Sequence, residues 1–226
     1  SRAVVAEMAA SDTPVYGVST GFGALATRHI EPGLRTQLQK SLIRSHAAGA
    51  GPRVENEVVR ALMLLRLSTI ASGHTGVRLE TAEAYASMLN AGLTPIVREY
   101  GSLGCSGDLA PLAHCALAVM GEGEVDDHGV VRPAGEALTS YGLAPIELAE
   151  KEGLALINGT DGMLGMLVLA LHDLRRLLDT ADLAAAELPN GKTVAVAVQE
   201  MSGVIGEKLE LGRVGLLEGT IATYLH

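Results

Sequence analysis

The segment Gly101–Cys115, GSLGCSGDLAPLAHC, holds the residues of this chain with the clearest potential for chemistry. Glycines and serines crowd a backbone turn, Asp108 follows them, and an apolar pattern typical of a helix begins at the next residue. In the simplest interpretation, Ser106 or Asp108 caps that helix, because a side-chain oxygen at its start can accept a free backbone N–H.

A reactive interpretation uses Cys105, Ser106 and Gly107 themselves. If the Gly107 nitrogen attacks the Cys105 carbonyl carbon, a five-membered imidazolone ring closes, and loss of water from Ser106 leaves an exocyclic methylene. This product is an electrophile that no ordinary side chain provides. Glycine suits the third position because a side chain would hinder the attacking nitrogen. Serine suits the second because its hydroxyl leaves as water.

The longer segment 101–124, GSLGCSGDLAPLAHCALAVMGEGE, resembles the prosthetic-group segment of the histidine and aromatic amino-acid ammonia-lyases. That family forms 4-methylideneimidazol-5-one (MIO) from such a tripeptide. The resemblance therefore implies an MIO built from Cys105, Ser106 and Gly107. The first residue is more often alanine in the family, but ring closure uses only its carbonyl group.

Two earlier segments resemble other parts of the same active site. The stretch YGVSTGFG, 16–23, looks like the family's mobile N-terminal loop, which implies that Tyr16 acts as a base or proton relay. The pair Ser45-His46 is similar to that of the histidine-specific branch, which implies that His46 contacts the substrate imidazole. Taken alone, Tyr16 fits an ordinary surface residue, and His46 fits a helix-end histidine stabilised by the helix dipole.

The stretch EGLALINGT, 152–160, resembles the second active-site segment of the family. This implies that Asn158 hydrogen-bonds the MIO carbonyl and helps to bind substrate. Taken alone, an asparagine before a helix most simply caps it. Four blocks thus resemble the family in the same order across residues 1–186, which is more specific than any one of them.

Helical periodicity predicts the elements that must position these residues. The predicted helices cover about 1–10, 33–48, 54–72, 80–89, 109–120, 163–186 and 194–207, and VDDHGVVRP, 125–133, predicts a short surface hairpin. The chain is 48% apolar with no Trp and one Phe, which suits helices packed on helices. We expect a mainly α fold, the N-terminal part of an aromatic amino-acid lyase (aspartase-like) fold, with a small α+β appendage at the C-terminal end.

The composition changes near Glu187, and we expect a domain division there. Residues 1–186 would form a truncated MIO lyase-like domain. Residues 187–226, with IGEKLELGRV and two short β-like pieces at 209–217 and 220–225, resemble a segment of translation elongation factor Ts. Lyases of the family continue with long helices that form a tetramer core. We therefore expect the apolar stripe of helix 163–178 to lack its covering helices in this chain.

Charge and cysteine content exclude several function classes. The net charge of −9 argues against binding to nucleic acid or anionic membranes. The two cysteines make no disulfide framework, and no secretion signal is evident, so we expect a cytoplasmic location. The longest apolar run, 163–171, is too short to span a bilayer. Cys105, His114 and Cys115 match no zinc pattern, so no metal is expected.

The resemblance implies an enzyme that converts L-histidine to urocanate and ammonia, working as a homo-oligomer, a tetramer in the family. Cys105, Ser106 and Gly107 would supply the electrophile, Tyr16 proton transfer, and His46 and Asn158 substrate contacts. The alternatives are a non-catalytic binding module acting through the factor-Ts-like end, for instance on an elongation factor GTPase, or an inactive fusion fragment.

Overall fold

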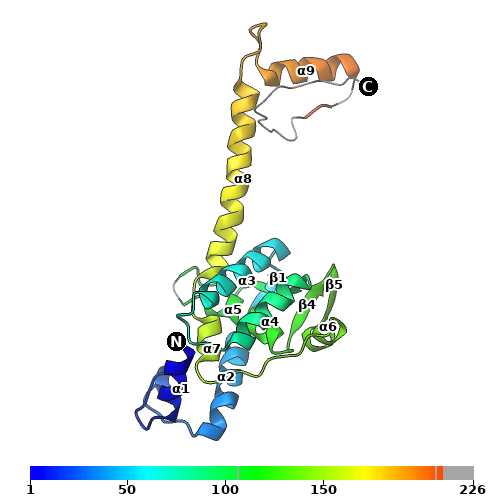
Figure 1. The fold of residues 1–226 in the computed structure, drawn as a ribbon. Coiled ribbons are helices and arrows are strands. Elements are labelled where there is room, and N and C mark those ends of the chain that lie inside the picture. The colour runs from blue at the N-terminus through cyan, green and yellow to red at the C-terminus, as the bar shows by residue number, and fades with distance from the viewer. Residues whose placement is uncertain (106, 207, 211–226) are drawn as a thin grey trace. The chain divides into compact units, whose positions relative to one another are not determined.

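The computed structural model describes residues 1–105, 107–206 and 208–210, and it is mainly helical (Figure 1). The chain divides into two compact units, Ser1–Val168 and Leu169–His226, which are described separately. Helices of the first unit are α1 (Arg2–Ala10), the 3-10 helix η1 (Gly23–Leu25), α2 (Pro32–His46), α3 (Asn56–Ala71), α4 (Leu79–Asn90), α5 (Leu109–Val119), α6 (Ala134–Ser140), α7 (Glu152–Ile157) and the start of α8 (Asp161–Ala185).

Short strands form two small antiparallel sheets beside these helices. β1 (Ala50–Arg53) pairs with β3 (Arg98–Tyr100), and a second sheet has the order β2 (Leu93–Pro95), β4 (Glu124–Asp127), β5 (Val130–Pro133). The predicted hairpin is confirmed as β4 and β5. Its two turn residues, His128 and Gly129, both have positive φ, as a tight hairpin turn requires. β2 adds a third strand that the sequence did not predict as part of this sheet.

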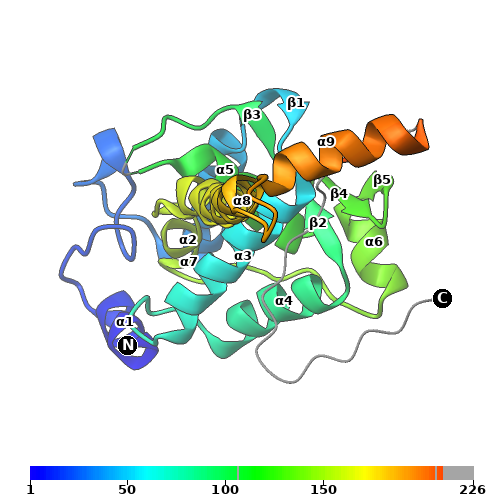
Figure 2. The same ribbon diagram turned by 90° about the horizontal axis from the view of Figure 1, so that it is seen from above.

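Helix α5 lies at the centre of the first unit. It packs against α2, α4, α6, α7 and β2, and it is surrounded by these elements in both views (Figures 1 and 2). Leu112, Ala113, Cys115 and Ala116 on this helix are fully buried. Small alanines let the neighbouring helices approach closely, so α5 fixes the positions of the elements that carry the candidate site.

The buried face of α2 differs from the predicted one. Helical spacing places Leu34 on one face with Leu38 and Leu42, but Leu34 is 59% exposed, whereas Arg35 and Gln39 are buried. The physical reason is that both polar side chains bond other segments. Arg35 donates to the carbonyls of Ala9 and Ile30, and Gln39 Oε1 accepts from the Gly153 amide at 2.9 Å.

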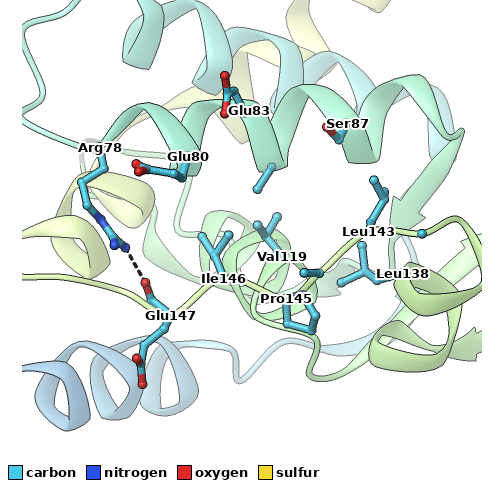
Figure 3. Close-up of a pocket in the computed structure, with 13 residues that line it drawn as sticks. Arg78, Glu80, Glu83, Ser87, Val119, Leu138, Leu143, Pro145, Ile146 and Glu147 are labelled. Carbon is cyan, nitrogen blue, oxygen red and sulfur yellow. Dashed lines mark hydrogen bonds between the residues drawn. The ribbon is translucent and has the colours of Figure 1, made fainter.

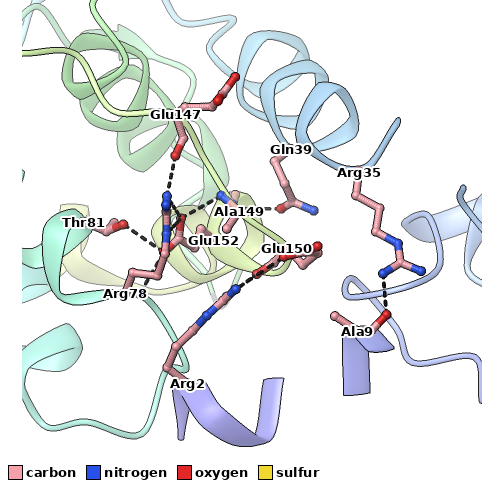
Figure 4. Close-up of polar contacts among 11 residues, drawn as sticks. Arg2, Ala9, Arg35, Gln39, Arg78, Thr81, Glu147, Ala149, Glu150 and Glu152 are labelled. Carbon is pink, nitrogen blue, oxygen red and sulfur yellow. Dashed lines mark hydrogen bonds and ion pairs between the residues drawn. The ribbon is translucent and has the colours of Figure 1, made fainter. Parts of the chain in front are cut away.

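A buried carboxylate anchors the start of α7 (Figure 4). Glu152 is fully buried and accepts hydrogen bonds from the Arg78 side chain and backbone, the Thr81 hydroxyl and the Ala149 amide. Burial acts to raise the pKa of the Glu152 carboxyl, but the hydrogen bonds from Arg78 and the backbone outweigh it and lower that pKa. The network ties α7 to the first turn of α4.

The second unit contains the rest of α8 and α9 (Val194–Ile205). Thr193 caps α9, because its hydroxyl accepts from the Val196 amide at 3.3 Å. Leu209 and Glu210 lie in neither helix nor strand, and the rest of the two predicted β-like pieces lies outside the described residues.

One stretch of the described chain, Glu152–Ala185, is long and apolar enough to cross a bilayer by length and composition. The predicted run, 163–171, covers only part of this stretch, which is longer because it joins α7 and α8. The most apolar window of 18 residues has a mean hydropathy of 1.7, and 28% of it is buried. The core helix of a soluble protein passes the same test, so this property is weak evidence for a membrane span.

Candidate functional site

The turn before α5 is held by the side chain of Asp108. This carboxylate is 1% exposed and accepts from the Leu103 amide at 2.8 Å and from the Ser102 hydroxyl at 2.5 Å. Asp108 is the N-cap residue of α5 by position, but its side chain makes no cap hydrogen bond. The predicted Asp108 cap is therefore wrong, because the carboxylate faces back into the turn. Ser106, the other predicted cap, lies outside the described residues.

Gly107 has φ +80°, in the left-handed region that residues with a side chain rarely adopt. Apart from its chain neighbours, an added Cβ would meet no described atom within 4 Å, so the backbone conformation and not the available space requires glycine. Cys105 is exposed. The two described residues of the tripeptide thus lie in a glycine-dependent turn directly before a buried helix, which fits the demand of ring closure for a compact turn.

His46 is the last residue of α2, and its ring is anchored to that helix. Nδ1 lies 2.8 Å from the Leu42 carbonyl oxygen and 3.0 Å from the Ser45 hydroxyl. A carbonyl oxygen only accepts, so the contact with Leu42 requires the proton on Nδ1. In the neutral ring Nε2 is then an acceptor, and it has no partner among the described residues.

The chain that leaves α2 packs against α5 and against the segment that precedes it. The Gly49 amide donates to Nε2 of His114 on α5 at 3.0 Å. An added Cβ at Gly101 would lie 3.0 Å from the Gly49 Cα and 3.2 Å from the Ala110 Cβ. The segment after His46 and the segment before the tripeptide therefore meet at the start of α5.

Asn158 is the C-cap residue of α7, so the predicted helix N-cap is not observed. Its carbonyl oxygen accepts from Nη2 of Arg66 on α3 at 3.4 Å. The chain then enters α8, where an added Cβ at Gly162 would lie 3.3 Å from Pro111 of α5. The segment that carries Asn158 thus also reaches the first turn of α5.

Tyr16 lies at the surface, with 51% of the residue exposed. Its ring packs edge to face on Phe22, with centroids 5.9 Å apart, and its hydroxyl accepts from the Gly23 amide at 3.4 Å. The following residue, Gly17, is buried. It lies beside α7, since a Cβ added to it would be 3.1 Å from the Leu154 side chain. The Tyr16 loop therefore borders α7, the helix whose C-cap residue is Asn158.

The structure thus brings the segments of the predicted residues together, at or beside the start of α5. No hydrogen bond or ring contact joins the side chains of Tyr16, His46 and Asn158 to one another in the part of the chain that the structure describes. Sequence reasoning missed Arg66. It also did not predict that His114 joins α5 to the segment after α2. Arg66 had a detectable signal, because it continues the buried stripe of Val58, Leu62 and Ile70 at intervals of four.

A pocket of about 420 Å³ lies elsewhere in the first unit, between α4 and the segment 142–147 (Figure 3). Its apolar wall includes Val119, Leu138 and Ile146, and Glu80 and Glu83 line it from α4. The predicted site residues are not part of its lining, so this pocket is separate from the candidate site.

Metal ligands do not gather anywhere in the described residues, where no group of three His, Cys, Asp or Glu side chains could hold an ion. Cys115 is fully buried, and burial raises the pKa of its thiol. A buried neutral thiol packs as a small apolar side chain and does not offer a thiolate ligand.

Comparison with known proteins assigns the fold to a family. Residues 1–193 match the model of the aromatic amino acid lyase family. The chain belongs to this family. Curated lyases similar to it include the histidine ammonia-lyases of Streptomyces griseus, 69% identical over 187 residues, and of Deinococcus radiodurans, 50% identical over 186 residues. Each alignment covers 82% of this chain but 36% of the relative, so the chain spans about a third of their length.

Solved lyase structures agree with this assignment. Histidine ammonia-lyase from Trypanosoma cruzi superimposes with a TM-score of 0.75 at 39% identity, over 81% of this chain and 35% of that one. The ergothionase of Treponema denticola gives a TM-score of 0.76 at 28% identity, over 91% of this chain and 43% of its own. The predicted lyase-like, mainly α fold is confirmed. The resemblance of residues 187–226 to elongation factor Ts stays a prediction.

Proposed function

We propose that this chain carries the N-terminal part of an MIO-dependent ammonia-lyase that eliminates ammonia from L-histidine to give urocanate. The observation that carries the proposal is the convergence on the first turn of α5. The tripeptide directly precedes that turn, and Gly162, after Asn158, lies against it. The segment after His46 contacts Gly101, before the tripeptide, and His114 on the next turn of α5. The histidine ammonia-lyases at up to 69% identity support the choice of substrate.

The tripeptide, once cyclised, supplies an electrophilic methylene that eases loss of the amine. His46 is suited to orient the substrate, because its Nε2 can accept a hydrogen bond from an imidazole N–H. The Asn158 amide can donate to the carbonyl of the cyclised tripeptide. Tyr16 supplies a phenolic hydroxyl for proton transfer from the border of α7.

The wider setting is part of the same proposal. Residues 1–186 act as the lyase-like domain, 187–226 as a separate appendage, and the protein works as a cytoplasmic homotetramer without a metal. Support for assembly comes from α8, where Leu167, Leu171, Leu174 and Leu178 are each about half exposed. Such a stripe requires a covering partner in water.

Intact mass tests the proposal first. Formation of the MIO removes two waters, one on ring closure and one from Ser106, so the purified chain should be lighter by about 36 Da, with the deficit confined to a peptide containing residues 105–107. The Ser106→Ala variant has no hydroxyl to lose as water, so its peptide containing residues 105–107 should have the unmodified mass. Urocanate formation from histidine is then measured by ultraviolet absorbance. A wild-type chain of unmodified mass would show that the tripeptide is only a turn, and the non-catalytic alternatives would take precedence.

A further inference from the structure

A buried ion pair lies where α7 passes into α8. Arg66 of α3 is 2% exposed, and its Nη2 pairs with Oδ2 of Asp161, the first residue of α8, which is 5% exposed. On α3 the arginine lies in register with the apolar Leu62 and Ile70. Burying two charges is costly, and a well-packed apolar pair is often at least as stable, so stability alone is a weak reason for this pair.

The same guanidinium also binds the end of α7. Nη1 donates to the Ala155 carbonyl at 3.1 Å, and Nη2 donates to the Asn158 carbonyl at 3.4 Å. The last carbonyls of a helix have no partner within it, so Arg66 satisfies one of these groups. A single side chain on α3 therefore holds both sides of the linker 158–160.

The linker is built around this side chain. An added Cβ at Gly159 would come within 2.9 Å of the Arg66 Cζ and 2.5 Å of Asp161 Oδ2. Only glycine leaves room for the guanidinium there. The far side of the linker is fixed as well, because Gly162 lies against Pro111 on the first turn of α5.

We propose that Arg66, held by Asp161, is a positioning residue that fixes Asn158 relative to the turn before α5. We call the bonds from Arg66 to Ala155, Asn158 and Asp161 the clamp, and they are observed in the structure. The catalytic consequence of the clamp rests on the proposed function of Asn158. Arg66 touches only the protein backbone and Asp161 among these contacts, so it acts through Asn158 and not on the substrate.

Hydrogen exchange of the full chain, followed by mass spectrometry on peptides covering 154–165, measures the clamp directly. In Arg66→Met the amides of Asn158 and Leu164 should exchange at least ~10-fold faster than in the wild type. Arg66→Lys keeps a positive charge near Asp161 but has fewer hydrogen-bond donors. Exchange of the same amides in this variant should therefore be faster than in the wild type and slower than in Arg66→Met. If Arg66→Met fails to fold, the lysine variant decides the result. Unchanged exchange in the folded variants would overturn the proposal.

Arg35→Met is the matched control. Arg35 is also a buried arginine that binds backbone carbonyls, those of Ile30 and of Ala9 (Figure 4). It lies far from the linker in sequence. Its replacement should leave exchange at 158–164 unchanged. Faster exchange there in Arg35→Met would show a general loss of stability and would overturn the specific role of Arg66.

Added L-histidine separates the clamp from the proposed function. It should slow exchange of the 158–164 peptide in the wild type and in Arg35→Met, and this protection should be lost in Arg66→Met. Protection retained in Arg66→Met would overturn the positioning role. If histidine protects neither the wild type nor any variant, and the wild-type mass is unmodified, the proposed function fails and so does the catalytic consequence of the clamp. The difference in exchange measured without histidine still decides whether the clamp exists.

Discussion

The Gly49 amide donates a 3.0 Å hydrogen bond to Nε2 of His114, which joins the exit of α2 to the middle of α5. Because Nε2 accepts, the neutral His114 ring carries its proton on Nδ1. Burial, together with the nearby Arg98 guanidinium, lowers the pKa of His114 below its usual value. The bond therefore depends on the neutral form of the histidine and lies just beyond His46.

This bond predicts a pH dependence of stability. A histidine whose pKa is lowered by folding binds a proton more readily when unfolded, so its stabilising contribution is complete above about pH 6.5 and is lost as the pH falls below that value. The free energy of unfolding, measured in urea, should decrease as the pH is lowered from 7.5 to 5.5. This decrease should be smaller in His114→Gln. The exposed His74 provides the control His74→Gln. An unchanged slope in His114→Gln would contradict the assignment.

Gly49→Ala should destabilise the same junction. An added Cβ would lie 2.9 Å from the His114 Nε2 and 3.1 Å from the Arg98 Cβ, and the surrounding contacts leave little space. We expect a loss of about 1 to 3 kcal/mol in the free energy of unfolding, measured in urea. Gly33→Ala on α2 is the control, since an added Cβ there meets no atom within 4 Å. Equal effects of the two substitutions would argue against a close contact at Gly49.

Much of the fold could be predicted because apolar residues recur at helical intervals. The predicted helix at 109–120 matches α5 (Leu109–Val119), and the helix at 80–89 matches α4 (Leu79–Asn90). The burial of Arg35 and Gln39 could not be predicted, because Ala9 and Gly153, to which they bond, lie far away in sequence. Periodicity reports which residues share a face of a helix, but it does not report which polar groups find a partner there.

The candidate site was predictable in its segments and not in its connections. The motif around Asn158 predicts a segment of the candidate site, but the Arg66 guanidinium that binds its carbonyl comes from 92 residues earlier in the chain. Asp108 was expected to cap α5, yet its carboxylate accepts from Leu103 instead. Such long-range or backward contacts depend on the packed structure, so local sequence rules do not reveal them.

Glu152→Gln should destabilise the first unit by about 2 to 3 kcal/mol, because it removes a buried charge whose partners remain. The lowered pKa of Glu152 means that its contribution is present above about pH 4.5 and is lost as the pH falls. Urea unfolding at pH 7 measures the loss. Glu150→Gln, which removes a half-buried partner of Arg2, should cost less than about 1 kcal/mol. A Glu152→Gln variant as stable as Glu150→Gln would refute the anchoring role of the network.

Asp108→Ala should reduce formation of the ring. Its carboxylate holds the Leu103 amide and the Ser102 hydroxyl, so its removal frees the turn that must be compact for the Gly107 nitrogen to reach the Cys105 carbonyl. The fraction of chain with the ~36 Da deficit should fall to less than about half of the wild-type value. Asp173→Asn, at an exposed site on α8, should leave the fraction unchanged. Full modification in folded Asp108→Ala would show that the turn needs no such support.

Helix α8 should drive self-association of the chain. Leu171, Leu174 and Leu178 are 55%, 49% and 55% exposed and recur at intervals of three and four, so they form one apolar face. Replacing all three with Gln should weaken association at least about a hundredfold, because each buried leucine contributes ~1.5 kcal/mol or more to an apolar interface. Sedimentation velocity at ~10 μM should show an oligomer for the wild type and a monomer for the triple variant. The control Asp173→Asn with Arg176→Gln, which changes an exposed ion pair of α8, should remain an oligomer. A wild-type chain that sediments as a monomer would mean that this face is covered by something other than a second copy.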